Sequence, residues 1–424
     1  MPHLRRAGWV ITILSLTAIA FATLLPEPFP AIGSHMCLVC GVFGGVNAIL
    51  NVLLFVPLGL GLALSGFSGK RALLIVCALS TMVEAAQLFV IPGRYATIGD
   101  ILTNTAGGAL GFAAAQRART WLLPAVPVAR NLLIGWCAIW LTVQALSSFA
   151  FTPSAPDSRY YGQIARELGH FAVFDGQVLS ARIGDIAITD TRLRDNDSVG
   201  RRLLSGATVA VTVVPAGLTS DIAPIVRVAD AERREIVLLA QDERALLFGV
   251  RTGAAILRLR PPLFGMPGVF ADRAATSGSP ANDTVSLGGR YHAGVAQLTA
   301  LAGGARQDRR VPISSALGWT LLLPFQWFIE DTRTERIVSW IWMAGLIVPI
   351  GYWGARVWRF SDLSASPTLA VLCFLGGAAI LIGGLFFVPR TLGLSAAPVR
   401  DWLASASGII GGVALASASR RAAQ

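Results

Sequence analysis

Two apolar stretches of the chain carry pairs of polar side chains at helical spacing. Glu84 and Gln87 lie three residues apart within the run 71–91, and Asp100 and Asn104 lie four residues apart at the start of the next run. Residues three or four apart share one face of an α-helix. An ionisable side chain inside a membrane-spanning helix costs about 2.5–3.5 kcal/mol on insertion scales, so we expect a functional site that faces a partner or a wet cavity.

The composition is that of an integral membrane protein. Of 424 residues, 54% are hydrophobic and only 14% are charged, and the mean hydropathy is +0.61. Sixteen of the 24 acidic residues lie between residues 157 and 310, and six of the other eight fall in loops or at helix ends, which leaves Glu84 and Asp100. The net charge of +11 comes mainly from Arg residues, many of which flank apolar runs, so it indicates membrane orientation and no nucleic-acid partner.

Eight apolar runs have the length and composition of membrane spans. They cover residues 9–25, 48–66, 72–91, 98–115, 132–151, 337–355, 368–388 and 402–416. The first run follows a basic start and ends at a Pro-rich segment. We expect an uncleaved first span there, with a cleaved signal peptide as the alternative.

Loop charges predict the orientation of these spans. Basic residues precede the first run, separate the second from the third and the fourth from the fifth, follow the sixth and end the chain. Under the positive-inside rule these segments are cytoplasmic, so both termini lie inside and residues 152–312 lie outside. We expect a multi-pass protein of a bacterial inner membrane with a periplasmic middle domain.

Residues 152–312 have the character of a soluble all-β domain. Short β-branched or aliphatic runs alternate with turn clusters of Gly, Asp, Asn and Pro, which predicts a sandwich of antiparallel strands. The runs include 207–215, 222–230, 234–241, 245–252, 254–261 and 283–289. A spacer or protein-contact domain and a ligand-binding domain both fit this pattern, because a fold does not determine a function.

The tail begins with an apolar segment that is too short to cross a membrane. The run 317–329 is interrupted by Pro324 and contains Trp319 and Trp327. Because the basic C-terminus requires an even number of spans, we expect residues 313–333 to form a helix along the outer interface. A three-span membrane tail would then cover residues 334–424.

Several linked motifs near the N-terminus resemble a known family. N-x-L-L-F-V-P-L-G covers residues 51–59, E-x-x-Q covers 84–87, Arg94 lies in the following turn, and D-I-L-T-N-T-A-G-G-A-L-G covers 100–111. Over about residues 9–119 the chain resembles the VanZ-like membrane family, named for a protein associated with teicoplanin resistance. We therefore expect a five-span VanZ-like module over residues 1–151. The middle domain more weakly resembles concanavalin A-like, laminin G-like jelly rolls.

The resemblance implies a characteristic polar set, whose chemistry suits an envelope lipid. As an enzyme, the protein would use Glu84 or Asp100 as general base, with Arg94 holding a phosphate of a lipid-linked glycan or phospholipid headgroup. The amide side chains would bind that substrate: Asn51, Gln87 and Asn104. The absence of HExxH, GxSxG and P-loop motifs leaves enzymatic activity open.

Three other interpretations of the polar set and the domains remain. Glu84, Arg94 and Asp100 could form a buried salt-bridge network that only fixes the helix hairpin. The protein could be a non-catalytic envelope scaffold or receptor whose jelly roll binds glycan or protein. It could also be a transporter, although no repeat relates the two membrane parts.

Cys37 and Cys40 form a C-x-x-C motif on the first outer loop. One such motif without a second ligand pair is a weak zinc signal, and the four His residues are scattered. We therefore expect no metal and no cofactor. An oxidising outer compartment permits a local disulfide, and two free thiols are the alternative.

Overall fold

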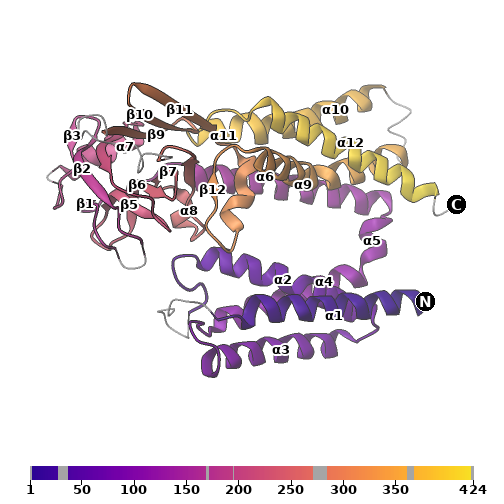
Figure 1. The fold of residues 1–424 in the computed structure, drawn as a ribbon. Helices are drawn as coiled ribbons and strands as arrows, with labels where there is room; N and C mark the ends of the chain where they lie inside the picture. Colours follow the sequence, from indigo (N-terminus) through magenta and orange to yellow (C-terminus); the bar gives the residue numbers. More distant parts are fainter. Residues whose placement is uncertain are drawn as a thin grey trace.

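A computed structural model describes residues 2–26, 37–168, 171–193, 195–270, 284–360 and 367–421. Two groups of helices lie side by side, and a β-rich domain lies at one end of them (Figure 1). The first helix, α1 (Pro2–Leu24), begins at the end of the helices that is far from this domain. The last helix, α12 (Val399–Arg421), ends at that same far end.

Six helices in the described part of the chain are long and apolar enough to cross a membrane. Besides α1 and α12 they are α2 (Gly44–Leu64), α3 (Gly69–Phe89), α6 (Val126–Phe151) and α9 (Arg333–Phe360). The prediction of a multi-pass membrane protein is confirmed. The two other predicted spans fall on α4 (Ile98–Gln116) and on the helical stretch α10 (Pro367–Ile382), η5 (Gly383–Phe387) and α11 (Val388–Thr391).

Helix α4 packs directly against the backbone of α2, because glycines line the contact. A Cβ atom added to Gly107 would lie 2.2 Å from the carbonyl oxygen of Val52, and one added to Gly111 would lie 1.9 Å from that of Val56. Small residues let membrane helices approach closely in this way. Helix α4 also packs against α3, so α2 and α3 cover it together.

Helix α6 belongs to the second group, together with α9, α10, α11 and α12 (Figure 1). The indole N–H of Trp136 donates to the carbonyl oxygen of Leu346 on α9 at 2.7 Å. Trp140 packs on Gly384 of the π-helical segment η5, where an added Cβ would lie 2.4 Å from the indole ring. The sequence predicts a first module of five spans and a tail of three. In the structure, α6, which covers the fifth predicted span, packs with the tail and not with α1–α4. The short helix α5 (Ala118–Leu122) connects the groups.

The β-rich domain consists of two six-stranded sheets in the described residues. The first sheet has the order β1 (Tyr161–Ile164), β5 (Ala223–Ala229), β6 (Glu235–Asp242), β7 (Ala245–Val250), β8 (Leu263–Met266) and β12 (Phe328–Ile329). The second has the order β11 (Ala305–Pro312), β10 (Val295–Ala302), β9 (Val285–His292), β4 (Val209–Pro215), β2 (Gly176–Ile183) and β3 (Ile186–Ala187).

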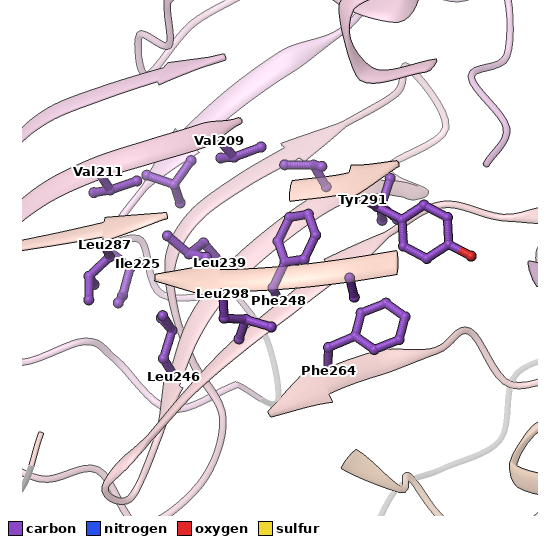
Figure 2. Packing of buried hydrophobic residues seen from close by; sticks show 14 of the residues in the cluster. Val209, Val211, Ile225, Leu239, Leu246, Phe248, Phe264, Leu287, Tyr291 and Leu298 are labelled. Carbon is purple, nitrogen blue, oxygen red and sulfur yellow. The ribbon is translucent and has the colours of Figure 1, made fainter. Parts of the chain in front are cut away.

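The apolar faces of the two sheets enclose a common core (Figure 2). Val211 and Leu287 of one sheet face the same interior as Leu239 and Phe248 of the other, and burial of each Leu or Phe contributes about 1.5–3 kcal/mol. Tyr291 fastens this core to the membrane part: its hydroxyl donates to the carbonyl oxygen of Phe151, at the end of α6, at 2.6 Å. Burial raises the pKa of Tyr291, so the hydroxyl remains a donor.

The expected β-sandwich is thus present, with departures from an all-β, antiparallel arrangement. Strand β12 pairs with β8 in parallel, and the domain includes the helix α7 (Asn196–Leu204). The run 254–261, predicted as a strand, instead contains the end of the short helix α8 (Gly253–Ile256). The Gly253 N–H donates to the carbonyl oxygen of Thr152 at 2.9 Å, so α8 docks on the end of α6 instead of joining a sheet.

The expected interfacial helix over residues 313–333 is wrong. The segment forms a 3₁₀ helix, η3 (Ser315–Leu322), followed beyond Pro324 by strand β12. Leu317 is buried in the sandwich core and Ala316 in the core of the second helix group. Packing into both cores, with a proline in the middle, excludes a continuous amphipathic helix.

We predict that Gly111→Ala destabilises the protein, because the new methyl group has no room beside the Val56 carbonyl. Overpacking of this kind costs about 1–3 kcal/mol. The melting temperature in detergent, measured by differential scanning fluorimetry, should fall. Gly135→Ala on α6 is the matched control, since Gly135 is exposed and its added Cβ meets open space. Equal melting temperatures of the two variants would contradict the close α2–α4 contact.

Candidate functional site

Thr97 is the residue through which the polar side chains of α3 and α4 meet. It is the N-cap residue of α4, and its hydroxyl accepts a hydrogen bond from the Asp100 N–H at 3.0 Å. The same hydroxyl donates to Asp100 Oδ2 at 2.7 Å. Such a cap satisfies one of the N–H groups that have no partner within the first helical turn.

Glu84 completes this cap from a different helix. Its Oε2 accepts a hydrogen bond from the backbone N–H of Thr97 at 2.8 Å. In an ordinary capping box, the acid three residues after the N-cap residue accepts from this N–H. Here Glu84 of α3 takes that role, although its side chain is only 6% exposed. It lies five residues before the end of α3, or about 7.5 Å along the helix axis.

Asp100 extends the network to α2. Its Oδ1 accepts a hydrogen bond from Asn51 Nδ2 at 2.6 Å, and both side chains are half-buried. The partial positive charge at the N-terminus of α4 stabilises carboxylates placed there. We call Asn51, Glu84, Thr97 and Asp100 the polar junction, because they join α2, α3 and α4.

Asn104 lies one helical turn beyond the polar junction. Its Nδ2 donates to Ser80 Oγ on α3 at 3.0 Å. The side chain is 2% exposed, and its Oδ1 has no hydrogen-bond donor within the described part of the chain. Burying a polar atom without a hydrogen-bond partner costs about 1–3 kcal/mol of stability. A ligand that donated a hydrogen bond to this oxygen would recover part of that cost.

Gln87 and Arg94 bind the end of α1. Gln87 Nε2 donates to the carbonyl oxygen of Thr23 at 2.9 Å. Arg94 donates from Nε to Leu25 and from Nη2 to Ala22, in both cases to the carbonyl oxygen at 3.1 Å. Cations and donors near a helix C-terminus are favourable because its last carbonyls lack helical partners.

The structure thus separates the six predicted residues into two sets. Asn51, Glu84 and Asp100 share the polar junction, with Asn104 nearby. Gln87 and Arg94 donate hydrogen bonds to the end of α1.

Thr97, which lies at the centre of the junction, was missed by the sequence reasoning. The signal for it was present: Thr97 and Asp100 form the T-x-x-D pattern that precedes helices. Ser80 gave no signal, because a serine in an apolar helix usually bonds only to its own backbone.

Cys37 and Cys40 are joined by a disulfide in the structure. Their loop reaches the start of α4, where the Gly99 N–H donates to the Cys37 carbonyl oxygen at 3.2 Å. Among the residues that the structure describes, no group of three or more His, Cys, Asp or Glu side chains could hold a metal ion.

The sandwich carries a pocket of about 220 Å³ between the segment after α6 and helix α7. Its polar lining includes Asp157, Ser158, Tyr160, Asp197 and Arg201. The Tyr160 hydroxyl donates to the carbonyl oxygen of Pro156 at 2.5 Å. Burial, aided by the charge of Asp230, raises the pKa of Tyr160, so this hydroxyl remains protonated.

Comparison with known proteins bears on the first helix group alone. The VanZ/LLP1 family model matches residues 9–119, which include α2, α3, α4, the polar junction and most of α1. No curated protein and no solved structure matches the chain significantly. The resemblance of residues 9–119 to VanZ-like proteins is therefore confirmed, and the β-sandwich is assigned from its strands alone.

We predict that Thr97→Val lowers stability, because it removes the hydroxyl that both caps α4 and binds Asp100. Loss of an N-cap costs about 0.5–2 kcal/mol. Thr97→Ser keeps the hydroxyl and should retain most of the stability. Thermal unfolding in detergent measures both effects, and a valine variant as stable as the serine variant would show that the cap contributes little.

Proposed function

We propose that this protein is a cell-envelope membrane protein that binds the polar headgroup of an envelope lipid at the polar junction. The observation that carries the proposal is the convergence of two carboxylates on Thr97 near the ends of α3 and α4, beside the half-buried Asn51. Carboxylate and amide oxygens accept hydrogen bonds from hydroxyl groups. The ligand class is therefore a hydroxyl-bearing headgroup, as in a lipid-linked glycan or a phospholipid.

The neighbouring residues support the same ligand class. Asn104 Oδ1 is a buried acceptor one turn from Asp100, and Gln87 lies three residues after Glu84 on α3. Arg94, which is half-buried in the turn between α3 and α4, would hold the phosphate of the lipid. In this proposal the hydroxyls of the headgroup face Asp100 and Asn51, and the phosphate faces Arg94.

We further place the polar junction in the outer leaflet and the sandwich outside the membrane. Basic residues flank the opposite ends of the helices, as the positive-inside rule requires of cytoplasmic segments. In this topology α4 and the stretch α10–α11 are also spans, which gives an even total and places both termini inside. The arrangement in Figure 1, with the start of α1 and the end of α12 far from the sandwich, supports it.

We predict that Glu84→Gln loses a lipid that the wild-type protein carries. An amide oxygen can still accept from the Thr97 N–H, so this change removes the charge while keeping the cap. Native mass spectrometry of gently extracted protein should show bound lipid or lipid-linked glycan, reduced about tenfold or more in Glu84→Gln and Asp100→Asn, since charge-assisted hydrogen bonds contribute about 1.5–3 kcal/mol.

Glu243→Gln is the matched control, because Glu243 is exposed on a turn of the sandwich. Equal lipid occupancy in all variants, or no lipid in any of them, would contradict the proposal. Accumulation of an altered headgroup with the wild-type protein but not with Glu84→Gln would show that a carboxylate also acts as a general base.

A second candidate function rests on the pocket of the sandwich. We propose that Asp157, Ser158 and Arg201 contact an envelope glycan there, since carboxylate, hydroxyl and guanidinium groups together bind sugar hydroxyls. This would make the outer domain a receptor, with or without turnover at the polar junction.

The full-length protein in detergent should then bind selected glycans on an array of envelope glycans. Asp157→Asn and Arg201→Ala are predicted to lose that binding, and Glu243→Gln to keep it. A silent array, or binding that neither variant changes, would favour a spacer role for the sandwich.

A further inference from the structure

The loop that precedes α2 touches both the polar junction and the sandwich. On the membrane side, the Cys37 carbonyl oxygen accepts from the Gly99 N–H at 3.2 Å, one residue before Asp100. A Cβ added to Gly99 would lie 2.1 Å from the carbonyl oxygen of Leu38, so the loop lies directly on the backbone of α4. The N–H of Gly99 has no partner within its own helix, and the loop therefore caps the first turn of α4.

On the other side, the sandwich caps α2 through one residue. The carbonyl oxygen of Arg258 accepts from the N–H groups of Gly45 and Val46, at 3.1 and 3.3 Å. Arg258 has φ +54°, a left-handed conformation that residues other than glycine seldom adopt. Such a backbone outlier is maintained only where the surrounding contacts enforce it.

Side chains strengthen the same contact. The Arg258 guanidinium donates to the carbonyl oxygen of Val39, between the two disulfide-bonded cysteines. The guanidinium carbon of Arg260 lies 4.1 Å from the ring centroid of Phe43, a cation–π distance. One short stretch of the sandwich thus contacts the loop at Val39, Phe43 and the start of α2.

This contact lies at the end of the first helix group that is remote from α5 (Figure 1). Between α1–α4 and the sandwich, the backbone hydrogen bonds in the described residues are the two accepted by Arg258. The first helix group is therefore connected to the second group through α5 at one end. At its other end, the disulfide loop and the start of α2 contact the sandwich, and α2 also approaches η3.

We propose that residues 37–46 form a redox-sensitive latch that couples the sandwich to the polar junction. With the Cys37–Cys40 bond intact, the loop presents the Cys37 carbonyl to Gly99 and the Val39 carbonyl to Arg258 at the same time. A dithiol reductant opens the latch: its two thiols become a disulfide, the Sγ–Sγ bond breaks, and each cysteine sulfur gains one electron and one proton. The open loop no longer holds both carbonyls, and the first turns of α2 and α4 lose protection.

Hydrogen exchange of the full-length protein in lipid nanodiscs tests the latch directly. The amides of Gly45, Val46 and Gly99 are expected to exchange at least about tenfold faster after reduction, as for N–H groups that lose their acceptors. Peptides covering 43–50 and 95–104 report them, and alkylation with mass analysis verifies that both thiols are free. Unchanged exchange in both peptides after complete reduction would overturn the proposal.

Two variants separate the disulfide from the sandwich contact. Cys37→Ser combined with Cys40→Ser should show the faster exchange without reductant. Arg258→Gly keeps the left-handed backbone but removes the guanidinium, and should accelerate exchange in both peptides even when the disulfide is intact. An Arg258→Gly variant that exchanges like the wild type would refute the coupling to the sandwich. The readout needs no bound lipid, so it stands apart from the lipid-binding experiment.

Discussion

The first N–H groups of a helix have no acceptor within the helix, so a helix that starts in apolar surroundings must find protein partners for them. At α4 the Glu84 carboxylate meets this constraint by accepting from the Thr97 N–H. The Thr97 hydroxyl accepts from the Asp100 N–H, and the Cys37 carbonyl oxygen accepts from the Gly99 N–H. An acid that is costly in an apolar helix is thus stabilised by the partial positive charge of the next helix, and its position on α3 fixes where α4 begins.

The start of α4 in turn places the rest of the first helix group. Asp100, in its first turn, meets Asn51, and the glycines further along come to lie against the backbone of α2. The second helix group is organised differently, by large buried side chains such as Trp140 and by a firm connection to the sandwich through Tyr291. The polar junction therefore sets the register of the first group, whereas the second group is fixed by contacts with the tail and with the sandwich.

The sequence predicted the membrane character and the β-sandwich, because long apolar runs and strand patterns are local signals. It did not predict that Arg94 binds the end of α1, since which helix end receives a guanidinium depends on tertiary packing. The grouping of α6 with the tail was hidden for the same reason: Trp136 finds its acceptor 210 residues away. The prediction of an interfacial helix over residues 313–333 was wrong because aromatic and apolar side chains are typical of a membrane interface. Here these side chains pack into the core of the sandwich and the core of the second helix group.

The long sequence separation between α6 and its partners has a consequence for synthesis. Gln144 of α6 is completely buried, and it binds Ser315 and Met343, both of which lie far beyond it in the chain. About 180 residues separate the end of α6 from the start of α9. At roughly 5–20 residues per second, the ribosome needs about 10–40 s to make them. During that time Gln144 lacks both of these partners, so its amide can be buried as in the folded protein only after the tail has been made.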